Sequence, residues 1–174
     1  MKITPAWKDA EGKGLKDLGW ALQYEGSIES EEEIEIEIGS RWLKLSGSLK
    51  SQRFITAGGG IEAGRGIEAG WGIEAGGGIE AGWGIEAGWG IEAGSGITAG
   101  EGIKAGWGIT AGEGIKAGLS ITCKKVLQWS FNLFAGTAVW RKTAEEECVI
   151  EAEELQGGEV KYGIVKLLHK EEKK

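Results

Sequence analysis

An isoleucine recurs at every sixth residue through the middle of the chain, and this repeat restricts the fold more than any other feature. It begins at Ile55 and ends at Ile121 without a break in phase. An alanine stands two residues after each isoleucine, with Cys123 in the last such position, and a glycine follows each alanine. The unit is Ile-x-Ala-Gly-x-Gly. A period of six excludes an α-helix, because six steps of about 100° scatter the isoleucines around the helix axis.

Each unit is instead typical of a short strand followed by a turn. In Ile-x-Ala the two apolar side chains point to one face and x points to the other. Glycine is poor in helices and tolerates positive φ, so Gly-x-Gly is interpreted as a corner. A three-residue strand becomes stable only when the next turn of the chain pairs with it. The sequence therefore predicts an all-β fold, a single-stranded β-solenoid (β-helix) with Ile and Ala inside and x outside.

Two coil sizes are compatible with the unit. Three units give a triangular coil of about 18 residues, and two give a flattened coil of about 12. The longer coil brings three corner tryptophans into one column, where aromatic rings stack well. The shorter coil is suggested by a duplicated segment that starts at Ile97 and recurs at Ile109. We favour the triangular coil at this point and leave the flattened coil open, together with the handedness.

The segments on either side of the repeat predict caps that close the solenoid. The predicted segments are an N-terminal cap at 1–42, the hexad-repeat solenoid at 43–122 and a C-terminal β cap with a hairpin at 123–174. In the first cap, strict alternation over Glu33–Ile38 predicts a half-buried strand. In the second, Gly157-Gly158 separates two strand-like runs and predicts a hairpin turn. Residues 170–174 are expected to form a frayed tail.

Charge and composition favour binding over catalysis. The net charge is −7, and residues 55–122 hold 8 acidic and 3 basic side chains. Such a surface repels nucleic-acid phosphates and anionic lipid and attracts basic partners. The two cysteines, Cys123 and Cys148, and the single histidine offer little material for metal or redox chemistry. We therefore expect no catalytic residues, no metal site and no cofactor, and expect both cysteines to be reduced and buried.

Location and membrane contact follow from what the sequence lacks. The first residues do not show the basic and apolar regions of a signal peptide, so a cytoplasmic location is expected. No run of apolar residues is long enough to span a membrane as a helix.

Six glutamates occupy the outward x position of consecutive units. They are Glu62, Glu68, Glu74, Glu80, Glu86 and Glu92. Like charges on neighbouring strands repel, so the array costs stability. One interpretation is solubility and protection against edge pairing. The other is a binding face for a basic protein, or a mimic of a nucleic-acid backbone. Catalysis is not expected, because identical repeats give the carboxylates identical environments, and cation binding would need further oxygens.

Four tryptophans occupy the corner position between the two glycines. They are Trp71, Trp83, Trp89 and Trp107. Exposed aromatic side chains mark interaction sites. Two other interpretations stay open, namely packing of the indoles over neighbouring glycines and stacking on sugar rings. Together with the six glutamates, these tryptophans are the predicted partner-binding residues.

The tract Ile61–Gly118 resembles the Gly-x-Ile-x-Ala-Gly repeat proteins that gut bacteria and their phages encode. It is more distantly similar to bactofilins, cytoskeletal proteins that polymerise through a triangular right-handed β-helix. The first resemblance implies a phage-type inhibitor of a nucleic-acid-binding host defence complex, and the second implies a self-assembling scaffold. Left-handed β-helix acyltransferases also have hexads, but their small residue stands four places after the aliphatic one and they use a histidine base.

These observations together predict a non-catalytic interaction protein rather than an enzyme. Its acidic, tryptophan-bearing face is expected to bind a basic protein partner, without direct contact to nucleic acid or membrane. A self-assembling scaffold of bactofilin type and a carbohydrate-binding module are the alternatives. Homo-oligomer formation stays open.

Overall fold

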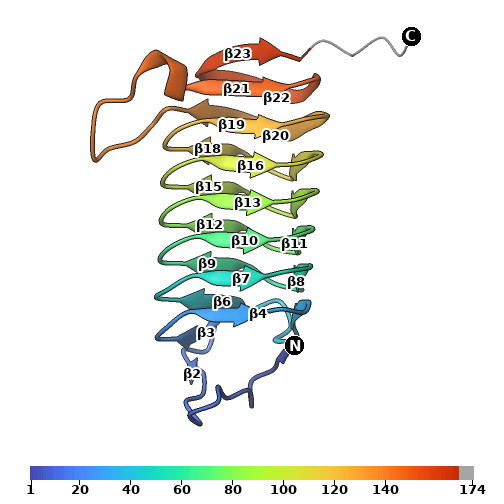
Figure 1. Ribbon diagram of the computed structural model, residues 1–174, viewed down its shortest axis with the longest axis vertical. Helices are drawn as coiled ribbons and strands as arrows, with labels where there is room; N and C mark the ends of the chain where they lie inside the picture. The colour runs from blue at the N-terminus through green and yellow to red at the C-terminus, as the bar shows by residue number, and fades with distance from the viewer. Residues whose placement is uncertain (169–174) are drawn as a thin grey trace.

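The chain winds into a stack of coils in a computed structural model that describes residues 1–168. Figure 1 shows the coils lying one above another, with the N-terminal strands at one end of the stack and the strand at Ile164–Leu167 at the other. Strands of successive coils pair in parallel, as Ile67 does with Ile85 and Ile85 with Ile103, whereas the short strand at Lys16–Asp17 pairs antiparallel. This spacing of about 18 residues confirms the β-solenoid and the triangular coil. The 12-residue coil is wrong, and the duplicated segment at Ile97 and Ile109 lies on two different sides of the stack.

Three short strands complete one coil, so the stack has three flat sides, which the chain visits in the order side 1, side 2, side 3. Side 1 comprises β2 (Lys16–Asp17), β3 (Ala21–Tyr24), β6 (Trp42–Leu45), β9 (Ile61–Ala63), β12 (Ile79–Ala81), β15 (Ile97–Ala99) and β18 (Ile115–Ala117). Side 2 comprises β4 (Ile28–Ser30), β7 (Leu49–Ser51), β10 (Ile67–Ala69), β13 (Ile85–Ala87), β16 (Ile103–Ala105), β19 (Ile121–Cys123), β21 (Val149–Ala152) and β23 (Ile164–Leu167). Side 3 comprises β1 (Lys2–Ile3), β5 (Ile34–Ile36), β8 (Ile55–Ala57), β11 (Ile73–Ala75), β14 (Ile91–Ala93) and β17 (Ile109–Ala111).

Two longer strands turn a corner and run from side 3 to side 1. They are β20 (Val126–Ala135) and β22 (Glu154–Tyr162). The first half of β20 pairs with β17 on side 3, and its second half pairs with β18 on side 1. Sides 1 and 3 therefore form one continuous sheet of 15 strands, whereas side 2 is a separate sheet of 8 strands.

The interior of the stack consists of aliphatic columns that follow from the two-residue alternation within each strand. The isoleucines from Ile55 to Ile121 are at most 1% exposed, and the alanines two residues later lie beside them. Each isoleucine contacts its equivalents in the coils before and after it, as Ile91 does with Ile73 and Ile109. Burial of these side chains stabilises the fold by about 1.5–3 kcal/mol for each isoleucine.

The glycines of the repeat differ from the expectation that they adopt positive φ. Among residues 1–168, the glycines with positive φ all lie outside the regular units. The glycine after each alanine is required for another reason. A Cβ atom at these positions, from Gly64 to Gly118, would lie 1.8–2.5 Å from a carbonyl oxygen of the preceding coil. The repeat therefore needs this glycine so that two backbones can approach at the corner.

The stacked region extends beyond 43–122 in both directions. At the N-terminal end, β3, β4 and β5 already pair in parallel with the strands of the next coil, and the predicted strand at Glu33–Ile38 is β5 with a half-buried pattern. The segment that covers this end is formed by roughly the first twenty residues, in which Trp7 packs edge-on against Tyr24. The N-terminal cap is thus shorter than residues 1–42.

The predicted hairpin at Gly157-Gly158 is wrong. These glycines lie inside β22, which runs parallel to β20 and forms part of the last coil. The two glycines fit because a Cβ atom at either position would lie 2.0–2.1 Å from a carbonyl oxygen of Trp129 or Phe131 in β20. They mark close backbone approach rather than a turn. The expected tail at 170–174 lies outside the described residues.

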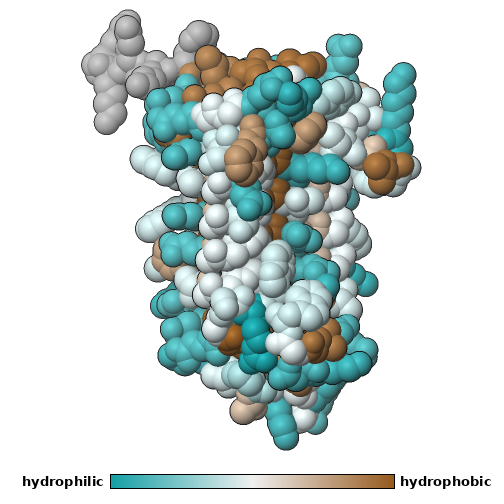
Figure 2. All heavy atoms as spheres, turned by 180° about the vertical axis from the view of Figure 1, so that it is seen from behind, coloured by the Kyte–Doolittle hydropathy of each residue, from teal (hydrophilic) through white to brown (hydrophobic). Residues whose placement is uncertain are grey.

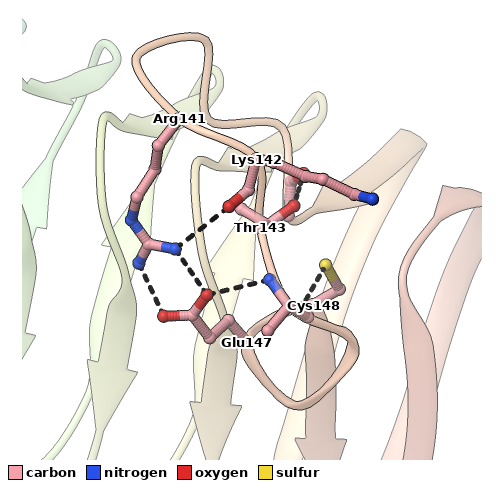
Figure 3. A network of polar contacts seen from close by, with 7 residues as sticks. Arg141, Lys142, Thr143, Glu147 and Cys148 are labelled. Atoms are coloured by element: carbon pink, nitrogen blue, oxygen red, sulfur yellow. Dashed lines mark hydrogen bonds and ion pairs between the residues drawn. The ribbon is translucent and has the colours of Figure 1, made fainter.

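A loop at 136–148 interrupts the stack between β20 and β21 and includes the 3₁₀ turn Glu145–Glu147. Figure 3 shows the guanidinium of Arg141 lying against the carboxylate of Glu147, with two contacts of 2.6 Å. The same carboxylate accepts a hydrogen bond from the Ala144 N–H, 2.9 Å away. The hydrogen bonds from Arg141, and to a smaller extent the one from the Ala144 N–H, lower the pKa of Glu147 to about 2. Because the folded pKa lies below the usual 4.5, the pair stabilises the loop above that pH and is lost as the pH falls toward 2.

Loss of this pair should open the loop to protease. In Glu147→Gln the charge that holds Arg141 is gone, so trypsin at neutral pH should cleave after Arg141 or Lys142 severalfold faster than in the unmodified protein. Mass spectrometry of a digestion time course measures the rate. Glu145→Gln removes an equal charge in the same turn and should leave the rate unchanged; equal acceleration in both variants would contradict the assignment.

Both cysteines are buried and unpaired, as expected from the sequence. Cys123 and Cys148 do not form a disulfide. Burial raises the pKa of the Cys123 thiol to about 11, so it stays protonated at neutral pH. The Cys148 Sγ lies 3.2 Å from the Ala144 carbonyl oxygen, a contact that Figure 3 includes. Cys123 belongs to the hydrophobic core of the stack, whereas Cys148 is buried at the end of the loop.

Candidate interaction surface

The six glutamates do not share one face of the solenoid. The 18-residue coil distributes them as one pair on each of the three sides, on neighbouring coils. The pairs are Glu62 and Glu80 on side 1, Glu68 and Glu86 on side 2, and Glu74 and Glu92 on side 3. The members of each pair are register partners, and neighbouring strands lie about 4.8 Å apart.

Lysines above or below the pairs offset the charge on sides 1 and 2. On side 2, Lys50 lies 3.0 Å from Glu68, and Lys104 lies 2.8 Å from Glu86. The Glu86 carboxylate raises the pKa of Lys104. On side 1, Lys44 lies 2.6 Å from Glu62. These exposed ion pairs contribute little to stability, but they occupy three of the six carboxylates.

The pair on side 3, Glu74 and Glu92, differs from the other two, and we call it the acidic pair. Its register neighbours are Thr56 and Thr110, which carry no charge. Within residues 1–168, neither carboxylate has a cation within ion-pair distance. The basic residue of this side, Lys2, lies at the N-terminal end and pairs with Glu35 and Glu37. Side 3 therefore keeps two adjacent negative charges available.

Three of the four predicted tryptophans form a column at the corner between sides 2 and 3, and we call Trp71, Trp89 and Trp107 the tryptophan corner. The backbone N–H of Trp89 donates to the Trp71 carbonyl oxygen, and that of Trp107 donates to the Trp89 carbonyl oxygen, both at 2.7 Å. The Trp71 and Trp89 rings stack with centroids 5.6 Å apart and planes 9° apart. The three side chains are 41%, 59% and 63% exposed. The stacking that favoured an 18-residue coil is therefore present.

The ends of this column carry positive charges. The Arg53 guanidinium lies 5.6 Å from the centre of the Trp71 ring, and the Lys125 ammonium lies 5.6 Å from the centre of the Trp107 ring. Both residues occupy the same corner position, one coil before Trp71 and one coil after Trp107. Cations are attracted to the faces of aromatic rings. The column therefore already accepts basic groups at both ends.

A groove of about 630 Å³ joins the tryptophan corner to the acidic pair. Phe54, Trp89 and Trp107 line it on the side of the corner, and Glu74 and Glu92 line it on side 3. Phe54 contacts Trp71 and Trp89 edge-on, at 5.3 and 6.1 Å between centroids. The arrangement provides aromatic surface and uncompensated negative charge within one concave site.

Trp83 lies at a different corner from the other three tryptophans. It occupies the corner between sides 1 and 2, where the Arg65 guanidinium lies 5.5 Å from its ring centre. The nearest groove, about 400 Å³, is lined by residues of side 2 that include both of its ion pairs and by Glu101, so the glutamates of side 2 that line it already have lysine partners. Trp83 and the acidic pair do not form one site.

Sequence reasoning missed three contributors to the groove and its borders. These residues, Phe54, Arg53 and Lys125, lie outside the regular units, so the repeat does not predict their positions. Counting 18 residues back from Trp71 and forward from Trp107 would have found both cations in the same column. Phe54 stands where the repeat places a glycine, and its ring lies over Gly72 of the next coil. The interpretation that corner aromatics pack over glycines thus applies to Phe54.

Comparison with protein-family models, with curated proteins and with solved structures finds no match to this chain. The resemblance to phage-encoded repeat proteins and to bactofilins therefore stays a prediction. Among residues 1–168, no group of three or more metal-ligating side chains comes together. The same residues include no helix of the length and apolarity that crossing a membrane requires.

Proposed function

We propose that this chain is a non-catalytic interaction protein that binds a basic protein segment in the groove between the tryptophan corner and the acidic pair. One observation supports this proposal above others: of the three glutamate pairs, the one that has no lysine partner within residues 1–168 lies beside the exposed indoles. Two adjacent carboxylates attract arginine or lysine, and hydrogen bonds between charged groups are about twice as strong as neutral ones. Tryptophan and tyrosine dominate binding energy where aromatic side chains line an interface.

The dimensions of the groove favour an extended segment. Its lining residues come from four successive coils, from Phe54 to Thr110. Three coil spacings of about 4.8 Å give a length of about 14 Å, which corresponds to about four residues of extended chain. In such a segment alternate side chains point the same way, so basic residues can face the acidic pair while apolar ones contact the indoles.

The other functions receive less support from the geometry. A mimic of a nucleic-acid backbone needs a row of free negative charges, whereas the six carboxylates are divided among three sides and three are paired with lysine. A sugar-stacking platform needs open ring faces, and the stacked faces of Trp71 and Trp89 lie against each other. An inhibitor of a host defence complex is compatible with the proposal if the surface of that complex presents a basic segment.

A designed peptide tests the proposal. A fluorescently labelled hexapeptide of alternating arginine and leucine should bind the protein with a Kd of about 10 µM or lower in a fluorescence anisotropy titration. The double variant Glu74→Gln/Glu92→Gln should weaken binding by about tenfold or more, because two charge-assisted contacts are lost. Trp89→Ala/Trp107→Ala should weaken it by a similar factor.

The matched control is Glu68→Gln/Glu86→Gln on side 2. It removes the same net charge from carboxylates that are already paired with lysine. We expect a change below about threefold, since exposed pairs contribute little. Equal weakening by the two glutamine double variants would show non-specific attraction to an acidic protein and would refute the proposed site, as would unchanged binding in all three variants.

A further inference from the structure

The two ends of the solenoid differ in whether the aliphatic interior is covered. At the C-terminal end, Leu155 and Val160 lie over Leu127 and Leu133, and Val165 lies over Ile150. The residues one coil below are 0% exposed, whereas Val165 is 42% and Leu167 is 58% exposed. Figure 2 shows hydrophobic atoms gathered at the top of the molecule, where β22 and β23 lie in Figure 1. We call this surface, formed by Leu155, Val160, Val165 and Leu167, the open end.

The N-terminal end is closed by comparison. The first coil there places Leu22, Ile28 and Ile34 in the interior, and these side chains are at most 3% exposed. Trp7 and Leu15, from the segment before β3, pack against this interior. The open end has no equivalent cover among the described residues.

The open end also leaves backbone groups unpaired. Among the described strands, β22 pairs only with β20, and β23 pairs only with β21. Within residues 1–168, their outer edges therefore have no strand partner along the three sides of the coil. Exposed edges of this kind are templates for pairing with another strand. A surface with an apolar centre and unpaired strand edges around it is complementary to a second solenoid end that has the same two features.

We propose that two copies of this chain associate through their open ends, related by a twofold axis perpendicular to the solenoid. Such an axis brings side 1 of the last coil against side 1 of the partner copy. Side 2 of each copy then meets side 3 of the other. Strands that meet in this way run antiparallel, so edges can pair by backbone hydrogen bonds. The interface is isologous, with the same patch on both copies.

The charges of the last coil are complementary under this operation. On side 1, Glu159 and Lys161 stand on either side of Val160. An antiparallel pairing centred on Val160 places Glu159 of each copy opposite Lys161 of the other. The exchanged sides carry Glu154 in β22 and Lys166 in β23, again acid against base. Within one chain Glu159 and Lys161 form an ion pair with each other. In the dimer each of these side chains would instead pair with the opposite charge of the partner copy.

The covered N-terminal end is expected to limit the assembly to two copies. Strand edges are present there too, since β4 pairs only with β7 and β1 only with β5 among the described strands, but residues before β3 cover the interior. Among the described residues, the second open apolar end that filament growth needs is therefore missing. Each side of the coil is about 20 Å long, so the end offers less than the roughly 800 Å² per partner of a standard interface. We therefore expect a dimer with a Kd of about 1–100 µM rather than a permanent one.

Sedimentation velocity over about 1–300 µM protein tests the proposal. The unmodified chain should shift from monomer to dimer, and Val165→Lys/Leu167→Lys should stay monomeric by placing four charges in the interface. These side chains are already 42% and 58% exposed, so the variant should fold. The control Val139→Lys/Trp140→Lys makes the same kind of change in the exposed loop at 136–148 and should dimerise normally.

A cysteine at the axis tests the arrangement independently. Val160→Cys should form a disulfide-linked dimer under mild oxidation, since residue 160 of each copy faces its equivalent, while both native cysteines are buried. A protein that stays monomeric throughout the range, a dimer that the control variant also abolishes, a dimer without the cross-link, or growth into filaments would each overturn the proposal.

Discussion

Replacing Gly106 with alanine should lower the free energy of unfolding by about 3 kcal/mol or more. The added Cβ atom would lie 1.8 Å from the carbonyl oxygen of Gly88 and 2.8 Å from its carbonyl carbon. Both atoms belong to the backbone of the preceding coil, which parallel hydrogen bonds hold on either side of the corner. A flexible side chain could move away, but this backbone can do so only by separating the two coils. Urea denaturation followed by circular dichroism measures the loss.

The second glycine of the unit supplies the control. A Cβ atom at Gly90 would lie 3.5 Å from the carbonyl oxygen of Gly108, an ordinary contact distance. The φ angle of Gly90 is not positive, so alanine can adopt its conformation. Gly90→Ala should therefore leave stability unchanged or raise it by about 0.4–1 kcal/mol, because alanine restricts the unfolded chain. Similar destabilisation at Gly90 and Gly106 would contradict the close-approach explanation.

The architecture could be predicted because the same six-residue unit, with the same alternation of apolar and polar positions, occurs many times in succession. The inward position of Ile and Ala follows from alternation within three residues, and every unit gives the same answer. The coil of 18 residues followed from the spacing of Trp71, Trp89 and Trp107, which lie in one column, with the Trp71 and Trp89 rings stacked. These are local properties of the unit or of its period, and the sequence carries both.

The flanking coils could not be predicted in the same way, because their spacing departs from the period. Leu22 pairs with Leu43, and Leu127 pairs with Leu155, both more than 18 residues apart. Extra residues in these coils shift the phase, so the repeat no longer signals that β3 and β22 belong to the stack. The single glycine pair in β22, Gly157-Gly158, then has the composition of a hairpin turn although it lies within a strand.

The sequence predicted which residue types form the candidate site, but not which of the six glutamates and four tryptophans belong to it. All six glutamates are equivalent within their unit, and what separates them is the residue one coil away. Glu68 has Lys50 as its register neighbour, whereas Glu74 has Thr56. That difference is visible only after the coil length is known. It reduces the six glutamates to the acidic pair, and the same reasoning separates Trp83 from the tryptophan corner.

Replacing Ile91 with alanine should cost about 2–5 kcal/mol, the range for removing a large aliphatic side chain from a packed interior. Ile91 is 1% exposed and lies between Ile73 and Ile109 in an unbroken column. The strands on either side of it are fixed by parallel pairing, so the coil cannot collapse to fill the cavity. Because each coil contacts only its neighbours, a defect here also weakens the coupling between the two halves of the stack. Urea denaturation should show a lower midpoint and a broader transition.

Two substitutions in the same strand separate the cavity from other effects. Ile91→Val removes one methylene and should cost about 0.5–1.5 kcal/mol, which places it between the unmodified protein and Ile91→Ala. Glu92→Ala changes the outward neighbour, which is exposed and faces the like charge of Glu74, so stability should change by less than about 0.5 kcal/mol. If Glu92→Ala proved as costly as Ile91→Ala, the stability of the solenoid would depend on its outer surface rather than on the isoleucine columns. If each coil contributes one aliphatic layer to a packed interior, the free energy of unfolding should rise from Ile91→Ala through Ile91→Val to the unmodified protein.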